Sequence, residues 1–354
     1  MNRTVGVCGY SSSGSSAFID FLREFDETQI LDNFEFQLVH LPDGLEDLEF
    51  HVRNYHHYKS SIIAINRFRK FIKTINFMPA SGEEIDKITD VFLKKIIQYS
   101  CNSSGFYTDR YIHSKLEKLA LKLIKKIFRK KKTNKIYYTF KKQFSYKMEL
   151  SIMSKDFDEA SKRFVSDILD AMGRKYQSPG GVIVLDQAFE TCNPVKSFKF
   201  FENPIALIID RDPRDNYLFT KNFLQPRGVG NIIPCDNVDD YIKYFRLVRQ
   251  CPPDLRERGD IIFLNFEELV YDYENTTKKV ADFVGVTKHA HKGEFFKPTH
   301  SRNNSQLFRK YNGFESDIKK IEKELSEYIF PFENYPDIEP EGGMFWGSQK
   351  KKRR

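Results

Sequence analysis

The chain has 354 residues, 40% of them hydrophobic and 15% aromatic, which excludes a disordered protein and supplies one large core or two modest ones. A formal net charge of +8 and a pI near 9.0 predict an anionic binding partner, such as a nucleotide, an acidic glycan, nucleic acid or an anionic membrane surface. The cysteines stand far apart with no Cys-x-x-Cys pair, which indicates neither a disulfide framework nor a zinc ribbon: Cys8, Cys101, Cys192, Cys235 and Cys251.

Secretion and membrane insertion are not indicated by any segment. Residues 1–20 carry no basic region followed by an apolar core, and no run of about 18 apolar residues occurs. We therefore expect a soluble protein in the cytoplasm, where a reducing environment suits the cysteine pattern.

The first predicted elements are a strand, a tight loop and a helix. Residues 4–10 form a β-rich run that ends in glycine, and residues 17–22 place apolar side chains at helical spacing. A second strand is predicted in "FEFQLVHLPDG", residues 34–44, because this apolar run closes in a Pro-Asp-Gly turn.

Residues 51–176 have a different pattern, with apolar residues at spacings of three and four and Lys and Glu between them. Helices are predicted at 56–75, 82–99, 114–128 and 156–173. This helical insertion is too long for a simple crossover, and insertions on α/β sheets often form lids or substrate walls. We expect acceptor specificity to lie there.

Three later apolar runs, "GVIVLD" (181–186), "IALIID" (205–210) and "DIIFLNF" (260–266), are typical of buried parallel strands, and each precedes a helical pattern. The predicted fold is a three-layer α/β domain with a parallel central sheet of about five strands and a P-loop-like first turn. We expect one domain over 1–345, with the helical insertion at 51–176 inside it and a basic tail at 346–354.

The first loop, "GYSSSGSS" from Gly9 to Ser16, has the glycine spacing of a phosphate-binding loop. Such a turn points backbone N–H groups at one anion, and the helix N-terminus adds partial positive charge. A nucleotide triphosphatase has lysine where this loop has Ser15. The alternative interpretation is a tight turn in which Ser15 or Ser16 caps the helix.

With the later motifs, the chain resembles the sulfotransferases that use 3′-phosphoadenosine 5′-phosphosulfate. The family's first loop is similar to "GYSSSGSS", and the resemblance implies that it holds the 5′-phosphosulfate. The implied contacts are Gly9, Tyr10, Ser11, Ser12, Ser13, Gly14, Ser15 and Ser16. Many members have Lys or Arg at the position of Ser12, so another basic residue has to supply the charge. Arg67, Arg69 or a late-loop residue is the candidate.

The family's second motif resembles "RDPRD", residues 211–215, after the strand at 205–210. The resemblance implies that Arg211 binds the 3′-phosphate together with a hydroxyl eight residues later; that position holds Phe219, and Thr220 follows it. An arginine beyond the carboxyl end of a parallel strand faces the ligand crevice and can fork onto a phosphate. The alternative is a set of surface pairs between Arg211, Arg214 and the two aspartates.

Two further stretches extend the resemblance to about residues 1–50 and 180–325. Residues 263–286 are similar to family scaffold, and residues 301–313, "SRNNSQLFRKYNG", are similar to the late loop over the adenosine end. The implied late-loop contacts are Ser301, Arg302, Asn303 and Arg309.

Sulfuryl transfer needs a base for the acceptor hydroxyl, which in this family follows a middle strand. That position resembles "LDQAFE", so Asp186 is the first candidate, with Gln187 as a positioning neighbour and Glu190 next. Asp186 has a simpler alternative role as the cap of the following helix.

Histidine pairs occur at 56–57 and at 289 and 291, but no accompanying ligand spacing indicates a metal, and His300 merely precedes the late loop. No metal is expected. The basic runs Lys125–Lys135 and Lys350–Arg354 predict solvated surface or contact with an anionic membrane, without a nucleic-acid motif beside them.

The expected function is sulfuryl transfer from 3′-phosphoadenosine 5′-phosphosulfate to a hydroxyl of a glycan or small molecule, with 3′,5′-adenosine bisphosphate as product. The alternatives are a P-loop kinase or NTPase, in which the strands ending at residues 186 and 210 supply a Mg²⁺-holding Asp, and an inactive nucleotide- or glycan-binding module.

Overall fold

The computed structural model describes residues 2–103, 146–174, 180–229 and 233–343, together with single positions at 116, 119, 122, 123 and 126. The chain divides into two compact units, Met1–Gln37 with Arg174–Arg354 and Leu38–Gly173. The predicted single domain over 1–345 with its insertion at 51–176 stays a prediction. Most of the predicted helix at 114–128, the run Lys125–Lys135 apart from Lys126, and the tail Lys350–Arg354 lie outside the described residues.

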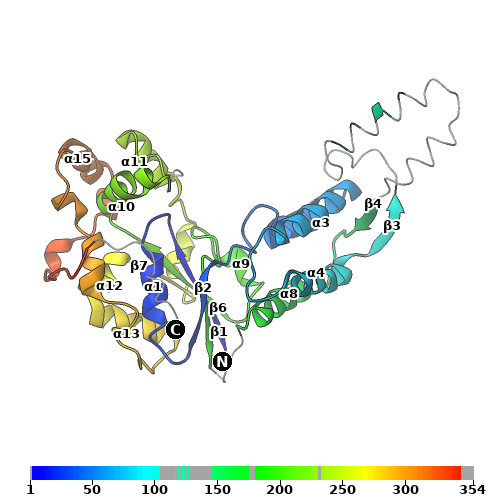
Figure 1. Cartoon of the computed structure of the whole chain (residues 1–354), viewed down its shortest axis with the longest axis horizontal. Coiled ribbons are helices and arrows are strands. Elements are labelled where there is room, and N and C mark those ends of the chain that lie inside the picture. Colours follow the sequence, from blue (N-terminus) through cyan, green and yellow to red (C-terminus); the bar gives the residue numbers. More distant parts are fainter. Residues whose placement is uncertain are drawn as a thin grey trace. The chain divides into compact units, whose positions relative to one another are not determined.

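The first unit is built on a five-stranded sheet of order β2-β5-β1-β6-β7 in which all neighbouring strands are parallel. Its strands are β1 (Arg3–Gly9), β2 (Thr28–Glu35), β5 (Val182–Asp186), β6 (Pro204–Asp210) and β7 (Ile261–Asn265). The three later apolar runs form β5, β6 and β7 as predicted. The α/β class with a parallel central sheet of five strands is confirmed (Figure 1).

Helices cover one face of this sheet, and Phe189 packs against the other. On the first face, alternate residues of β1, β5 and β6 share a core with α1 (Ser15–Leu22), α12 (Phe266–Tyr271) and α13 (Tyr273–Val284). On the second face a Cβ at Gly6 would lie 2.3 Å from the ring of Phe189, which precedes α9 (Val195–Phe198). This packing fixes the start of α1 beside the carboxyl end of β1.

The second strand lies earlier than predicted. β2 covers Thr28–Glu35, whereas the apolar run at residues 34–44 is mostly turn. The carbonyls of Leu38 and Val39 accept bonds from the N–H groups of Leu45 and Glu46, so this run closes onto the start of the next helix. Buried apolar residues in a folded-back turn give the same pattern as a buried strand, which is why the prediction was wrong.

The second unit contains α2 (Leu45–Asn54), α3 (Tyr58–Ile72), α4 (Gly82–Ile96) and α8 (Phe157–Ala171). The predicted helices at 56–75, 82–99 and 156–173 are confirmed, and Phe92 of α4 stacks on Phe164 of α8 with ring centroids 4.8 Å apart. An antiparallel pair was not predicted: β3 (Tyr99–Ser103) and β4 (Tyr146–Leu150). Two five-residue strands carry too few apolar positions to show a period of two.

The remaining elements of the first unit follow β6 and β7. They are α10 (Pro213–Phe219), a π-helix at Thr220–Leu224, α11 (Val238–Leu247), α14 (Pro298–Ser301), turns at Arg302–Asn304 and Leu307–Arg309, and α15 (Glu315–Glu324). Side chains of α10, α11 and α15 form a second core, with Tyr217, Tyr241 and Ile321 fully buried.

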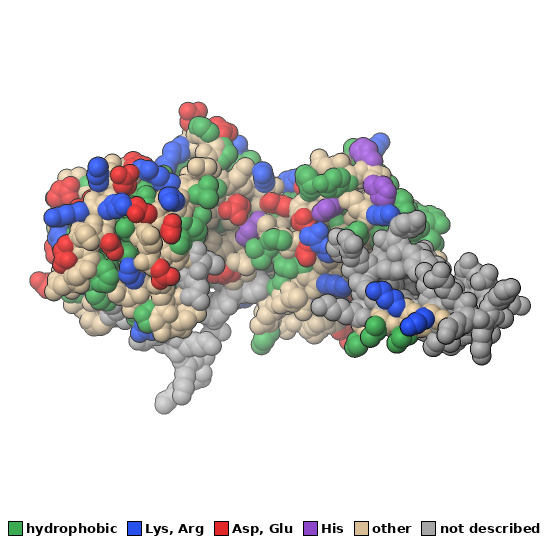
Figure 2. Space-filling model, turned by 90° about the horizontal axis from the view of Figure 1, so that it is seen from above, with side chains coloured by type: hydrophobic (Ala, Val, Ile, Leu, Met, Phe, Trp, Pro, Cys, Tyr) green, Lys and Arg blue, Asp and Glu red, His purple; other side chains and the backbone are tan. Residues whose placement is uncertain are grey.

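Acidic and basic side chains are interspersed over the first unit, which lies on the left of Figure 2. Several of them pair, such as Lys320 with Asp239 at 2.5 Å and Arg258 with Asp260 at 2.6 Å. None of the helices among the described residues is long and apolar enough to cross a membrane.

Candidate functional site

The first loop has a backbone that only glycine accommodates at two places. Gly14 has φ of 87°, and a Cβ there would lie 2.7 Å from the ring of Phe266. A Cβ at Gly9 would lie 2.4 Å from Oγ of Ser13. Ser12 also adopts a left-handed conformation, with φ of 63°. The loop is therefore a tight, strained turn at the carboxyl edge of the sheet.

Gly14→Ala is expected to reduce the free energy of unfolding by about 2–4 kcal/mol, from left-handed strain and from overpacking against Phe266. Gly313→Ala is the matched control, because Gly313 has the same φ of 87° but nothing within 4 Å of its added Cβ. Urea unfolding of both variants separates the two costs. Equal losses would show that contact with Phe266 does not constrain the loop.

The start of α1 is available to an anion. Gly14 stands at the N-cap position, and no side chain caps this helix in the described structure, so capping by Ser15 or Ser16 is not realised. The Oγ of Ser13, which is 1% exposed, has no hydrogen-bond partner among the described residues. A helix N-terminus with an unpaired buried hydroxyl beside it suits a phosphate or sulfate group.

Arg211 joins the first loop to the late loop, residues 301–313. Its side chain follows β6 and is 4% exposed, with Nη1 donating to the carbonyl of Ser12 at 3.2 Å and Nη2 donating to the carbonyl of Asn304. The guanidinium lies over the rings of Phe219 and Phe266, 4.9 and 5.4 Å from their centroids. Its Nε is buried without a partner in the described part of the chain.

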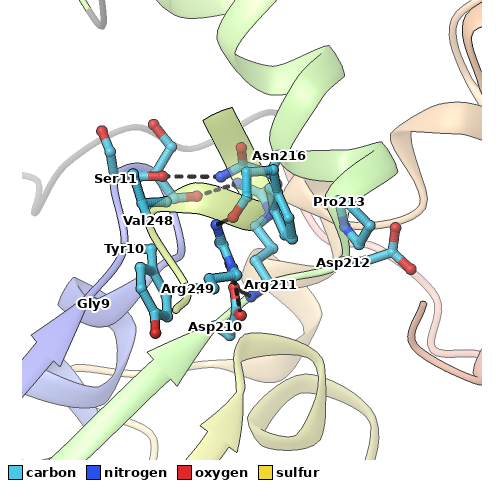
Figure 3. A network of polar contacts seen from close by, with 12 residues as sticks. Gly9, Tyr10, Ser11, Asp210, Arg211, Asp212, Pro213, Asn216, Val248 and Arg249 are labelled. Carbon is cyan, nitrogen blue, oxygen red and sulfur yellow. Dashed lines mark hydrogen bonds and ion pairs between the residues drawn. The ribbon is translucent and has the colours of Figure 1, made fainter. Parts of the chain in front are cut away.

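Two residues that sequence reasoning missed also hold the first loop (Figure 3). Asn216 of α10 donates from Nδ2 to the carbonyl of Ser11 at 2.9 Å. Arg249 forms a two-bond ion pair with Asp210, at 2.7 and 2.8 Å, and its guanidinium lies 4.1 Å from the ring centroid of Tyr10. Neither belongs to a motif, and only tertiary contact brings Arg249 to the loop.

The other charged residues of "RDPRD" have structural partners. Arg214 pairs with Asp212 at 2.7 Å, as one sequence alternative suggested, but both side chains are buried rather than on the surface. Asp215 accepts 2.6 Å bonds from the N–H groups of Gln306 and Leu307 and so anchors the late loop. Burial, with the charge of Asp212, raises the pKa of Asp215 to about 6, while Arg211 opposes the shift.

The predicted late-loop contacts have different environments. Arg302 pairs with Asp337 at 2.8 Å, and Asn303 donates to the carbonyl of Glu341 at 2.7 Å, so both hold the C-terminal segment. Ser301 ends α14 and is half-buried, whereas Arg309 is exposed with its guanidinium 5.6 Å from the ring centroid of Phe308. Thr220 is fully buried beside the Cys235 thiol.

The candidate base lies next to the first loop. Asp186 ends β5 and pairs in register with Val7 of β1. Burial, followed by the charge of Glu35, raises the pKa of Asp186 to about 7, and its Oδ1 has no hydrogen-bond partner among the described residues. A carboxyl group that titrates near neutral pH is suited to general-base chemistry.

Gln187 connects this base to the loop. It has φ of 51°, accepts from the N–H of Gly9 at Oε1 over 3.2 Å, and donates from Nε2 to Oγ of Ser15 over 3.4 Å. Glu190, the other candidate carboxylate, is exposed. The structure thus brings Asp186 and Gln187 to the loop, and the roles of all three stay predictions.

The candidate cations of the second unit are already paired within that unit. Arg67 pairs with Asp43 and with Asp47, and Arg69 pairs with Asp90 and Glu149. The described residues contain no group of three or more His, Cys, Asp or Glu side chains that could hold a metal. His289 packs instead: it stacks on Phe25 and contacts Glu24 at 2.8 Å.

No family model and no curated protein matches this chain. Two solved structures match most of its length. The sulfotransferase domain from the curacin biosynthetic pathway is 13% identical, covers 94% of this chain and 99% of its own, and has a TM-score of 0.37. Retinol dehydratase, solved with androsterone and the inactive cofactor PAP, is 12% identical, covers 92% and 80%, and has a TM-score of 0.30. Likeness at this level carries no argument about this chain.

Proposed function

We propose that the chain is a sulfotransferase that moves a sulfuryl group from 3′-phosphoadenosine 5′-phosphosulfate to a hydroxyl of a carbohydrate or glycan. One observation carries the proposal: the buried guanidinium of Arg211 contacts both Ser12 and Asn304. Three separate motifs that resemble those of the sulfotransferases therefore meet at one residue. A nucleotide with phosphate groups at both ends of its ribose would need such a junction.

The described residues fit this nucleotide. The first loop would bind the 5′-phosphosulfate through the start of α1 and the unpaired Oγ of Ser13, and Arg211 would bind the 3′-phosphate through its unpaired Nε. Arg309 is exposed, and no ion pair engages it within the described chain. It is our proposed contact to the adenosine end, while Arg302 and Asn303 shape the loop.

Arg211 also supplies positive charge beside the first loop, which has no Lys or Arg of its own. Its Nη1 bonds to the carbonyl of Ser12, the position where many sulfotransferases have a basic residue. The positive charge of Arg211 thus lies beside that position, in a buried environment where an electrostatic interaction is stronger than in water. We propose that Arg211 and the α1 N-terminus together stabilise the charge that develops on the leaving phosphate.

Asp186 is the proposed base. In its ionised form it would accept the proton of the acceptor hydroxyl, while Gln187 keeps the base and the first loop in fixed relation through Gly9 and Ser15. The nucleotide supplies the activated sulfuryl group; the chain supplies binding, orientation and the proton acceptor.

A kinase or NTPase is less well supported. Such an enzyme would use Asp210, at the end of β6, to hold Mg²⁺, but both carboxylate oxygens of Asp210 accept bonds from Arg249, at 2.8 and 2.7 Å. Lysine is also absent from the position of Ser15, where a triphosphatase needs it.

The test is transfer of labelled sulfate from the nucleotide to a panel of oligosaccharides, phenols and steroid alcohols. We expect label on a saccharide, without added metal. Label only on a phenol or steroid would overturn the acceptor class and leave the reaction type intact. Hydrolysis of ATP with Mg²⁺, with no sulfate transfer to any acceptor, would reject the proposed function.

A further inference from the structure

Two cysteines from distant parts of the first unit meet beside the first loop. Cys192 follows β5 and Cys251 follows α11, and their Sγ atoms lie 3.1 Å apart. The hydroxyl of Tyr10 lies 3.3 Å from Sγ of Cys251 and 3.7 Å from Sγ of Cys192. Both cysteines are free thiols and half-buried. Because 58 residues separate the two cysteines, no spacing pattern in the sequence indicates that they meet.

Neighbouring contacts hold the two sulfurs together. The thiol of Cys192 donates to the carbonyl of Val248 at 2.7 Å, and the N–H of Cys251 donates to the carbonyl of Arg249 at 2.9 Å. Arg249 is itself fixed by its ion pair with Asp210. Since a disulfide bond is about 2.0 Å long, the sulfurs at 3.1 Å need to approach by only about 1 Å to bond.

The surroundings also favour one sulfur as the nucleophile. The hydrogen bond with Cys192 lowers the pKa of Cys251 to about 6, and Tyr10 and Arg256 act in the same direction against burial and Asp210. The pKa of Cys192 is raised, first by its contact with Cys251 and then by burial. Of the two thiols, Cys251 is therefore the one that loses its proton more readily, while the S–H of Cys192 donates to Val248.

We propose that Cys192 and Cys251 form a site of reversible oxidation, at which hydrogen peroxide converts the thiol pair into a disulfide next to the first loop. The Cys251 thiolate attacks a peroxide oxygen, the O–O bond breaks, and the departing hydroxide takes up a proton to give water and a sulfenic acid. The Cys192 sulfur then attacks the Cys251 sulfur, the S–S bond forms, the S–O bond breaks, and a second water leaves with the Cys192 proton.

Oxidation would change what holds Tyr10. In the reduced protein its hydroxyl contacts the Cys251 sulfur while its ring lies against Arg249. In a disulfide the Cys251 sulfur carries neither a proton nor a negative charge, so that hydroxyl loses the contact it has in the reduced protein. The site thus connects the redox state of two thiols to a residue of the first loop, whatever ligand that loop takes.

To test this, the reduced protein is treated with increasing doses of hydrogen peroxide, and the remaining thiols are alkylated. Mass spectrometry of a non-reduced digest then shows the state of each cysteine. We expect a Cys192–Cys251 cross-linked peptide at peroxide doses that leave Cys101 alkylated, and its loss on treatment with dithiothreitol. Cys101, half-buried in the second unit, is the internal reference thiol.

Three variants sharpen the result. Cys101→Ser should form the cross-link at the wild-type rate, Cys192→Ser should let Cys251 proceed to sulfinic acid, and Tyr10→Phe should slow cross-linking several-fold at neutral pH. Alkylation of Cys192 and Cys251 in the wild-type protein at doses that oxidise Cys101 would overturn the proposal, as would cross-links only between molecules.

Discussion

Replacing Asp186 by asparagine is expected to lower turnover by about 100- to 10,000-fold while leaving nucleotide affinity close to that of the wild type. The carboxylate is the only part of the residue that changes, and an amide cannot accept the proton of an acceptor hydroxyl. Steady-state sulfate transfer gives the turnover, and calorimetric titration with 3′,5′-adenosine bisphosphate gives the affinity. Glu190→Gln is the matched control, because Glu190 is the exposed candidate four residues later. Unimpaired Asp186→Asn turnover with an impaired Glu190→Gln would transfer the role to Glu190.

The pKa of Asp186, raised to about 7, predicts how turnover and stability depend on pH. The base acts when ionised, so wild-type turnover should rise with pH through about 7. For stability the sign is opposite: a carboxyl pKa above its unfolded value makes the folded protein lose stability as pH rises towards 7. Asp186→Asn should therefore be more stable than wild type at pH 8, by at most about 4 kcal/mol, and should match it below about pH 4. A stability difference that does not depend on pH would contradict the raised pKa.

Arg211→Lys is expected to weaken binding of 3′,5′-adenosine bisphosphate by about 10- to 100-fold, since charge-assisted hydrogen bonds contribute about 1.5–3 kcal/mol. Lysine keeps the charge but cannot contact Ser12 and Asn304 at once or fork onto a phosphate. Calorimetry with the bisphosphate, and with adenosine 5′-monophosphate, separates the two ends of the nucleotide. The affinity for the bisphosphate should fall by a larger factor than the affinity for the monophosphate.

Arg309→Lys is the comparison for Arg211, because Arg309 is exposed and is our proposed contact to the adenosine end, which both nucleotides share. We expect a small change in affinity for both nucleotides. If Arg211→Lys and Arg309→Lys behave alike, or if Arg211→Lys affects both nucleotides equally, Arg211 does not recognise the 3′-phosphate.

The parallel sheet was predictable because its evidence is local. β5, β6 and β7 are short apolar runs that can be recognised without reference to the rest of the chain, and most residues of β5 and β6 are buried along the strand. β2 was misplaced because Phe36, Leu38 and Val39 are apolar and buried but lie in or beside a turn. The strands β3 and β4 were missed because each is stabilised by the other across a long stretch of sequence.

The site divides in the same way. The first loop, Arg211 and Asp186 stand at the ends of strands, so the sequence alone placed them at one edge of the sheet. Arg249 and the pair Cys192 and Cys251 were missed, because only tertiary contacts bring the segments after α11 and after β5 to Tyr10. For Arg302 the sequence suggested too much. Its motif suggested a ligand contact, but its guanidinium pairs with Asp337, which no local pattern indicates.

Thermal unfolding with added nucleotide distinguishes the proposed cofactor from ATP, because a ligand of the folded state raises the unfolding midpoint whatever the acceptor is. We expect 3′,5′-adenosine bisphosphate without metal to raise the midpoint more than ATP with Mg²⁺ at the same concentration, and Arg211→Lys to remove most of this difference. Stabilisation by ATP with Mg²⁺ and none by the bisphosphate would contradict this expectation.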